Sequence, residues 1–178
     1  MKLSTYREAD RAEIQELFEK TFTDSEGRSE GELIGRLVLD LMNRTAPQDI
    51  LGFVAIEQER IIGSIFFTRL SFDEPVEAFL LSPVAVHTDQ QGRGVGQRLV
   101  TFGIDQVREK GVSLVFTYGD PDFYSRVGFE PVPEGMAKAP FELTQPAGWL
   151  WQSLDGREIG SLSGRARCVE AFDNPAYW

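Results

Sequence analysis

The chain has 178 residues, of which 42% are hydrophobic and 11% aromatic, and its formal net charge at pH 7 is -10. This length and composition predict a single domain over residues 1–178, because the apolar content is enough for one core and is unlike that of a disordered chain. The negative charge repels phosphate backbones and anionic lipid headgroups, which argues against nucleic acid and membranes as partners. It suits a cationic substrate, although acidic surfaces also serve solubility alone.

Cysteine occurs once, at Cys168, so the chain can form neither an internal disulfide nor a cysteine-rich zinc site, and no metal is expected. The opening MKLSTYREADRAEI lacks the apolar core of a signal peptide. No run of about 18 consecutive apolar residues is present in the sequence. These features predict a cytoplasmic protein, and we expect it to be a monomer or a homodimer.

The first 45 residues predict a short strand followed by two helices. Residues 1–6 form the strand candidate, and apolar residues between 14 and 22 recur at helical spacing. Ser29, with Glu32 three residues later, is typical of a capping box, and an apolar stripe follows it. A second helix is therefore expected directly after this cap.

The middle of the chain predicts a sheet interrupted by one helix. Three consecutive antiparallel strands are expected at 50–57, 60–73 and 76–88. From Gly94 the period of 3.6 predicts a buried helix that ends at Gly111. Residues 112–118 form an apolar run that predicts a central strand, parallel to the strand before the helix because a long connection separates them.

The last third of the chain is poorer in regular patterns. Residues 130–148 contain four prolines and two glycines, which predict a long surface loop. Late strands are expected at 149–153 and 164–172, on either side of a turn at Asp155-Gly156.

Three glycines at alternate positions, Gly92, Gly94 and Gly96, separate the third predicted strand from the helix. They remove side chains where the chain turns, so successive backbone N–H groups can face a small concavity above the positive end of the helix. Such a turn predicts a pyrophosphate site, to which Arg93 or Arg98 can add a charged contact. The alternative is a tight turn that needs glycine for structure alone.

The spacing of these glycines excludes two better-known phosphate loops. It differs from the G-x-G-x-x-G of dinucleotide folds and lacks the Gly-Lys-Ser/Thr of nucleotide hydrolases. Instead, the sequence from Gln91 to Gly96 and the later residues Tyr124, Gly128 and Phe129 carry, in order and at the right spacing, Q-x-x-G-x-G and Y-x-x-x-G-F. The region 82–129 thereby resembles the GNAT superfamily of N-acetyltransferases, and its GDPDFYSRVGFEP wording is similar to the YhbS-like branch.

This resemblance implies the α/β GNAT fold, a central mixed and mostly antiparallel sheet that is splayed in the middle and flanked by helices. Pro83, next to Ser82, fits the start of the splay because proline cannot donate to a strand ladder. The resemblance also implies acetyl-coenzyme A as the cosubstrate. Its implied binding residues are Val84, Ala85, Val86, Gln91, Gly92, Arg93, Gly94, Val95, Gly96, Gln97 and Tyr124.

The family pattern places Tyr124 as the general acid that protonates the departing thiolate, since a phenol of pKa about 10 can serve a thiol of about 8.5. Packing against the cofactor is the alternative role. No glutamate base is present at the family positions, which leaves Asp120, or a water chain ending at Ser82, as tentative proton acceptors. The asparagine that many relatives carry seven residues before the tyrosine is Thr117 here, so its contact to pantetheine is in doubt.

Two further side chains, His87 and Cys168, belong to residue types that can take part in catalysis. His87, the only histidine, lies before the glycine turn and is expected to face solvent rather than act as a base. Cys168 has no histidine partner for a ping-pong route and is expected to be inert.

The expected reaction is direct transfer of the acetyl group to a primary amine in a ternary complex. A small molecule or a protein amine is the acceptor, enclosed by residues 23–29 and the loop 130–148. Two other classes stay open: a sensor that binds coenzyme A without turnover, and an interaction domain that retains the fold only.

Overall fold

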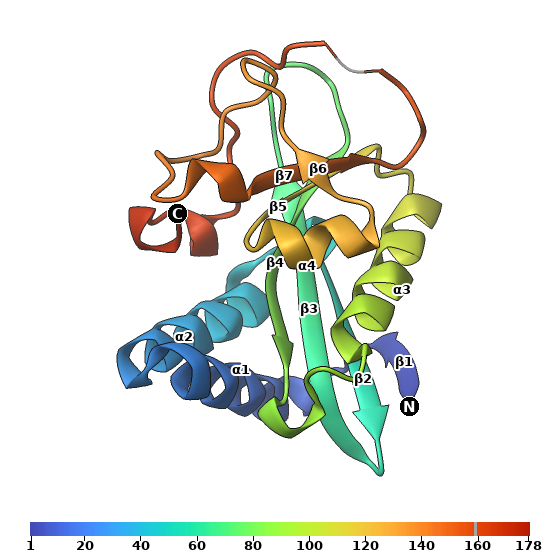
Figure 1. Ribbon diagram of the computed structural model, residues 1–178, viewed down its shortest axis with the longest axis vertical. Coiled ribbons are helices and arrows are strands. Elements are labelled where there is room, and N and C mark those ends of the chain that lie inside the picture. The colour runs from blue at the N-terminus through green and yellow to red at the C-terminus, as the bar shows by residue number, and fades with distance from the viewer. Residues whose placement is uncertain (159) are drawn as a thin grey trace. The chain divides into compact units, whose positions relative to one another are not determined.

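The computed structural model describes residues 1–158 and 160–178 (Figure 1). Among these residues, seven strands form one sheet in the order β1-β2-β3-β4-β5-β7-β6. The strands are β1 (Lys2–Thr5), β2 (Ile50–Glu57), β3 (Arg60–Leu70), β4 (Ala78–Val86), β5 (Leu114–Tyr118), β6 (Glu130–Pro131) and β7 (Trp149–Ser153). The α-helices are α1 (Arg11–Glu26), α2 (Arg28–Arg44), α3 (Val95–Glu109) and α4 (Pro121–Tyr124). Short 3-10 turns lie at Glu8–Asp10, Pro47–Asp49, Thr88–Gln90, Ser125–Val127, Pro146–Gly148, Glu170–Phe172 and Pro175–Tyr177.

The chain divides into two compact units, which are described separately below. The first consists of residues 1–66 and 83–103, and the second of residues 67–82 and 104–178. The boundaries fall inside β3, β4 and α3. The expectation of one domain over the whole chain stays a prediction.

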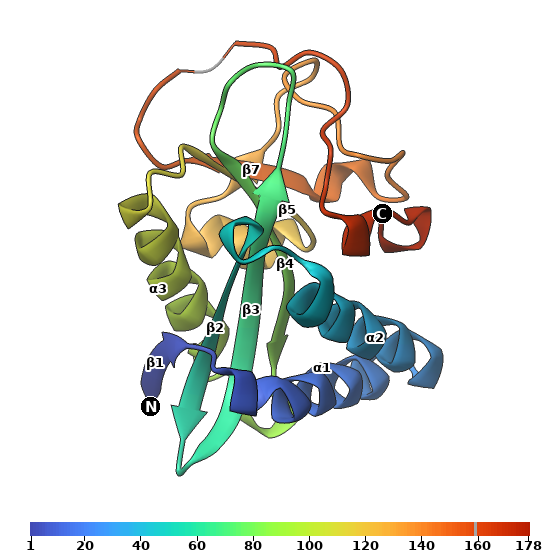
Figure 2. The ribbon, with the colours of Figure 1, turned by 180° about the vertical axis from the view of Figure 1, so that it is seen from behind.

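In the first unit, helices cover both faces of the strands. Phe18 of α1 packs on Phe66 of β3, with ring centroids 6.0 Å apart, and α2 lies alongside α1 (Figures 1 and 2). On the other face, Phe53 of β2 meets Phe102 of α3 edge-on at 5.5 Å. Successive residues of a strand point to opposite faces of the sheet. Because β2 and β3 are covered by helices on both faces, they are apolar along most of their length instead of alternating with polar residues.

A two-residue hairpin joins β2 to β3 at Gln58-Glu59. Both residues have positive φ angles, 50° and 62°, as a tight hairpin turn requires. In the second unit, β4 pairs with β5 in parallel, from Ala78 with Leu114 to Leu81 with Thr117. The predicted parallel strand after the long helix is therefore confirmed.

The second unit continues through β7, which pairs antiparallel with β5 and also with β6. Phe116 of β5 stacks on Trp149 of β7 at 5.1 Å, and Trp149 meets Trp178 edge-on at 6.1 Å. Both tryptophans are buried. These aromatic residues are part of the core of the second unit, and Thr117 and Leu150 lie on the opposite face of the same strands.

The predicted capping box of the second helix is wrong. Helix α2 begins at Arg28, so Ser29 lies inside its first turn, and no side chain caps the preceding residue, Gly27. Gly27 has a φ of 99° and ends α1 as well as starting α2. Glu32 pairs with Arg28 instead, at 2.7 Å. Because Gly27 is itself the residue at which the chain turns from α1 into α2, Ser29 lies too far into the helix to act as its cap.

The predicted late strand at 164–172 is also wrong. The N–H of Ala166 donates to the carbonyl of Lys138, and the N–H of Arg167 donates to that of Ser71. These contacts are isolated bridges, of Arg167 with Ser71 and of Arg165 with Lys138, and Glu170–Phe172 forms a 3-10 turn. The loop 130–148 is only partly a surface loop, since four of its residues are buried: Met136, Ala137, Ala139 and Gly148.

The described part of the chain contains no helix that is both long enough and apolar enough to span a membrane.

Candidate active site

The predicted glycine turn lies in the first unit, between the end of β4 and the start of α3. Gly92 and Gly94 have φ angles of 72° and 75°, which only glycine adopts without strain. A Cβ atom built on either residue would meet no atom within 4 Å. The turn therefore needs glycine for its backbone conformation and not for lack of space. The space beside Gly92 and Gly94 is free of other protein atoms.

The N-terminus of α3 follows the turn directly. The N–H of Arg98 donates to the carbonyl of Gly94 at 3.1 Å, so the helical ladder starts at Gly94. The three N–H groups before Arg98, those of Val95, Gly96 and Gln97, belong to the helix terminus, where donors have no helical acceptor and the helix dipole is positive. Gly96 is buried in this first turn.

Side chains of the turn bond to its own backbone and to each other. The amide of Gln91 donates to the carbonyl of Val86 at 3.0 Å and ties the turn to the end of β4. The guanidinium of Arg93 bonds to the side chain of Gln90, and Arg98 reaches the carbonyl of Arg93 at 3.3 Å. Both arginines are exposed, so two positive charges lie at the turn where the sequence predicted them.

His87 anchors the base of the turn, and the prediction that it faces solvent is wrong. Its side chain is 14% exposed, and its Nδ1 lies 2.7 Å from Oδ1 of Asp89. Its Nε2 contacts the guanidinium of Arg60, and its backbone N–H donates to the carbonyl of Ile62 at 2.8 Å. The ring is held between the start of β3 and the 3-10 turn, which is a structural role.

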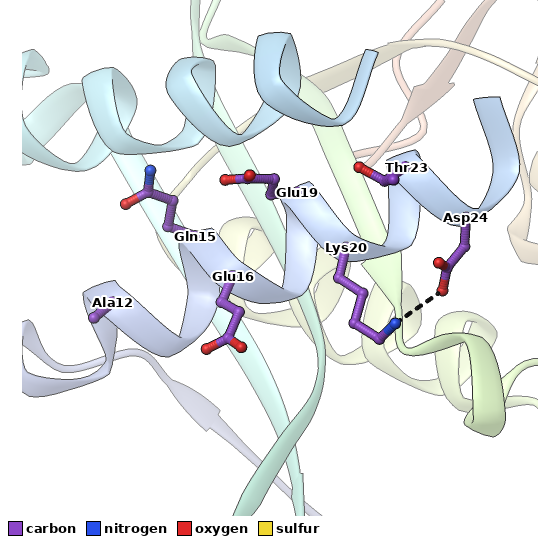
Figure 3. A pocket seen from close by; sticks show the side chains of 7 residues that line it. All are labelled: Ala12, Gln15, Glu16, Glu19, Lys20, Thr23 and Asp24. Carbon is purple, nitrogen blue, oxygen red and sulfur yellow. Dashed lines mark hydrogen bonds and ion pairs between the residues drawn. The ribbon is translucent and has the colours of Figure 1, made fainter. Parts of the chain in front are cut away.

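The end of α1 is joined to the same 3-10 turn. Asp24 accepts a hydrogen bond from the hydroxyl of Thr88 at 2.6 Å, which lowers the pKa of Asp24, and Lys20 lies 3.4 Å from the same carboxylate. A hollow of about 430 Å³ runs along this face of α1 (Figure 3). It is lined by Ala12, Gln15, Glu16, Glu19, Lys20, Thr23 and Asp24.

In the second unit, Tyr124 is the last residue of α4. Asp120 caps this helix, because its side chain accepts the N–H of Asp122 at 2.9 Å. Tyr124 is 8% exposed, and its ring meets Phe129 edge-on at 5.5 Å. Gly128, with a φ of 92°, reverses the chain so that the N–H of Phe129 donates to the carbonyl of Tyr124 at 3.1 Å. The tyrosine, glycine and phenylalanine of the motif thus form one packed unit.

Tyr124 has a raised pKa. Burial is the main cause and the charge of Asp120 adds to it, while a hydrogen bond with the side chain of Thr117 acts in the opposite direction. The hydroxyl is consequently protonated at neutral pH, as a proton donor must be.

Thr117 itself is fully buried and donates its hydroxyl hydrogen to the carbonyl of Leu81 at 2.8 Å. This bond joins the last residue pair in the register of β4 with β5. Ser82 and Pro83 follow immediately on β4, and Ser82 is half-buried. The register thus ends where the sequence placed the start of the splay.

Gly119 is a neighbour of Tyr124 that the sequence did not single out. A Cβ atom on Gly119 would lie 2.7 Å from Cε2 of Tyr124, so the tyrosine ring rests directly on this residue. The only signal in the sequence was its place between the strand and the tyrosine motif.

Cys168 is half-buried, and burial together with the Asp173 carboxylate raises the pKa of its thiol to about 11. A thiol so rarely ionised at neutral pH is a poor nucleophile, as expected.

Helix α3 is buried on one face only, since residues such as Arg98, Thr101 and Asp105 are exposed, so the prediction of a buried helix is correct for that face alone. These elements define an α/β protein in which a mixed sheet leads through a glycine turn into this helix. A model of the acetyltransferase (GNAT) domain matches residues 2–132. The chain therefore belongs to the GNAT family of N-acetyltransferases, which confirms the fold and the activity class predicted from the sequence.

Relatives along the whole chain agree. The chain is 32% identical over 174 residues to the uncharacterized N-acetyltransferase YjhQ of Escherichia coli K12, covering 94% of this chain and 92% of YjhQ. It is also similar to the crystal structure of Escherichia coli YhbS in complex with CoA, with a TM-score of 0.83, 25% identity, and coverage of 98% of this chain and 92% of that one. A GNAT acetyltransferase from Brucella melitensis in complex with acetyl-CoA gives a TM-score of 0.76 at 25% identity, with 97% of each chain covered.

Proposed function

We propose that this chain binds acetyl-coenzyme A at the turn from Gln91 to Gln97 and transfers the acetyl group directly to a primary amine. The observation that carries the proposal is the pair of left-handed glycines, Gly92 and Gly94, at the N-terminus of the 15-residue helix α3. Backbone N–H groups at such a terminus suit a pyrophosphate. The solved relatives with CoA and acetyl-CoA support the choice of ligand.

The end of β4 is proposed to hold the pantetheine arm. Val84 and Val86 are half-buried and alternate with the buried Ala85. Their backbone groups offer donors and acceptors to an amide-bearing chain, and one N–H is assigned to polarise the thioester carbonyl. Gln91 holds the carbonyl of Val86, which fixes the direction in which this strand end runs.

The proposed reaction begins with attack of a neutral amine on the thioester carbonyl carbon. The C–N bond forms, the tetrahedral intermediate collapses, and the C–S bond breaks to release a thiolate. Tyr124 gives its proton to the sulfur, the nitrogen loses a proton to a base or to solvent, and the phenolate takes a proton back from water. The products are an N-acetyl amide and coenzyme A.

The proton acceptor for the amine remains a prediction, with Asp120 or a water chain from Ser82 as the two assignments. A lysine-like amine of pKa about 10.4 is only roughly one part in two thousand neutral at pH 7, so a proton acceptor or desolvation is required. Asp120 is exposed and already caps α4, whereas Ser82 is half-buried at the end of the β4 and β5 register.

The acceptor is proposed to be a cationic amine, either a small molecule or a protein amine. The net charge of -10 supports a cationic partner. Three acidic residues, Asp24, Glu16 and Glu19, line the hollow along α1. The hollow reaches residues 23 and 24, which belong to the segment 23–29 that is expected to enclose the acceptor. The lone Cys168 supports a reducing compartment such as the cytoplasm. Monomer and homodimer are both consistent with the proposal.

Two measurements on the purified chain test this function. Calorimetry with acetyl-coenzyme A should show binding in the micromolar range, and thiol release should be detected with at least one member of a panel of polyamines, aminoglycosides, lysine peptides and free N-termini. Binding without thiol release from any amine would favour the sensor. Absence of binding at millimolar acetyl-coenzyme A would favour the interaction domain and contradict the proposal.

A further inference from the structure

The hydroxyl of Tyr118, the last residue of β5, joins two neighbouring residues of the loop 130–148. It accepts the backbone N–H of Gln145 at 2.8 Å and lies 3.0 Å from the hydroxyl oxygen of Thr144. Thr144 donates its single hydroxyl hydrogen to the carbonyl of Trp178 at 3.1 Å, so the hydrogen of Tyr118 points to the Thr144 oxygen. A chain of hydrogen bonds therefore runs from Gln145 through Tyr118 and Thr144 to Trp178.

The far end of this chain is anchored by aromatic packing. The ring of Tyr118 stacks on that of Trp178, with centroids 6.3 Å apart and planes 14° apart. Trp178 is buried, and its indole N–H donates to the carbonyl of Phe172 at 3.1 Å. By contrast, residues 144–147 are all exposed, so hydrogen bonds rather than burial hold this segment. The hydroxyl of Tyr118 therefore links an exposed segment to a fixed core.

The end of the same loop lies against the residue on which the ring of Tyr124 rests. The N–H of Gly119 donates to the carbonyl of Gly148 at 3.0 Å, and a Cβ on Gly148 would be 2.8 Å from the carbonyl oxygen of Gly119. A Cβ on Gly119 would in turn be 2.7 Å from Cε2 of Tyr124. The loop and the tyrosine ring thus both contact Gly119, which places the segment 144–148 next to the proposed acid.

We propose that Tyr118 is a positioning residue for the acceptor amine, and that its hydroxyl holds the segment 144–148 as a fixed wall beside Tyr124. The inference rests on the proposed function, in which Tyr124 is the acid and the loop 130–148 encloses the acceptor. Tyr118 takes no part in proton transfer, and none of its covalent bonds forms or breaks. Because the wall serves the acceptor alone, the hydroxyl contributes to amine binding and not to the chemical step or to the binding of acetyl-coenzyme A.

Amide hydrogen exchange tests the contact independently of activity. In Tyr118→Phe the N–H of Gln145 loses its acceptor while the ring keeps its stack on Trp178. Exchange of this amide, followed by NMR, should therefore become about tenfold faster. The amide of Leu154, which donates to the carbonyl of Ser113 at 2.8 Å in the same unit, should exchange as in the wild type. Unchanged exchange at Gln145 would overturn the proposal.

Steady-state kinetics test the positioning role itself. Tyr118→Phe should raise the KM for the amine about tenfold, and should leave kcat and the KM for acetyl-coenzyme A within about twofold. Tyr6→Phe is the matched control and should change none of these, because it removes a tyrosine hydroxyl from the first unit, where the ring meets Phe66 edge-on at 5.6 Å. Faster exchange at Gln145 with an unchanged amine KM would contradict the inference, since the wall would then be loosened without effect on the acceptor.

Thr144→Val supplies a second route should Tyr118→Phe fold poorly. It removes the hydroxyl that links Tyr118 to Trp178 but keeps the bond from Gln145, so the amine KM should rise by a smaller factor, about threefold. The two substitutions share one hydrogen bond, so their combined effect should be smaller than the product of the separate effects. An amine KM that Thr144→Val leaves unchanged would count against the wall. If wild-type protein releases no thiol with any amine, the proposed function fails, whereas exchange at Gln145 still decides whether Tyr118 holds the loop.

Discussion

The candidate site in the first unit consists of backbone, and the one in the second unit consists of a side chain. At the glycine turn, the groups offered to a ligand are N–H donors, and their directions depend on two left-handed glycines. At Tyr124, the offered group is one hydroxyl, and its place depends on a ring packed between Gly119 and two phenylalanines. Substitutions in the two units should therefore have different effects. A change in the backbone of the turn should weaken the binding of acetyl-coenzyme A, whereas removal of the tyrosine oxygen should lower kcat.

The largest effect is expected for Tyr124→Phe. Removing the hydroxyl keeps the packed ring, so the melting temperature and the dissociation constant of acetyl-coenzyme A should change little. The kcat for amine acetylation should fall about a hundredfold, because the thiolate loses its proton donor. Thiol release under saturating cosubstrate measures this. An unchanged kcat would show that Tyr124 serves packing alone, and the second unit would then offer no chemical group to the reaction.

A smaller effect, on binding, is expected for Gly94→Ala. The side chain meets no neighbour, but a φ of 75° strains any residue other than glycine by about 1–2 kcal/mol, and the N–H groups must shift to relieve this strain. Affinity for acetyl-coenzyme A, measured by calorimetry, should weaken about tenfold.

Gly135→Ala is the matched control for that variant, because Gly135 has a φ of 73° and an equally open surrounding in the second unit. Both variants should lose similar stability in thermal unfolding, and only Gly94→Ala should lose affinity. Equal affinity losses would mean that strain in general, and not the phosphate turn, controls binding.

Substitution of Asp120 separates its cap from a role as base. Asparagine keeps the oxygen that accepts the N–H of Asp122, whereas alanine removes it and should cost about 1 kcal/mol of stability. We expect the melting temperature to fall by a few degrees for Asp120→Ala and to stay unchanged for Asp120→Asn. Because Asp120→Asn is stable, its pH profile of kcat/KM reports on the base alone, and loss of the acidic limb would assign that role to Asp120.

The smallest effect is expected for Cys168→Ser. With a thiol pKa of about 11, ionisation at pH 7 is negligible, so direct transfer should proceed at the wild-type rate. Labelling of Cys168 by iodoacetamide should be slow at pH 7 and should rise about tenfold per pH unit as pH approaches the pKa. An acetylated Cys168 trapped after mixing with acetyl-coenzyme A would establish a ping-pong route instead.

Sequence reasoning reached the parts of the molecule whose causes are local. Gly92 and Gly94 were readable because the left-handed backbone demands glycine whatever the surroundings, and the parallel β5 followed from the length of its connection. Tyr124 was found through the family resemblance, and no spacing argument would have placed its ring. Its assigned chemical role, like those of Ser82 and Asp120, stays a prediction.

The features that the sequence did not predict depend on contacts between residues that are distant along the chain. Gly119 has no property in the sequence that indicates a ring lying on it, and Thr117 was seen only as a departure from asparagine. Ser29 matched a cap, but Gly27 before it had already turned the chain. The strand predicted at 164–172 is replaced by isolated bridges to Lys138 and Ser71, two distant segments that no local pattern in the sequence identifies.

Gly119 also has an evolutionary consequence. It carries no group that reacts or binds, yet almost any replacement would be felt through the tyrosine ring beside it. Selection on this glycine therefore lasts only as long as the tyrosine is useful. In a descendant that has abandoned the chemistry, the two positions should drift together, and a bulky residue in place of Gly119 would mark that loss.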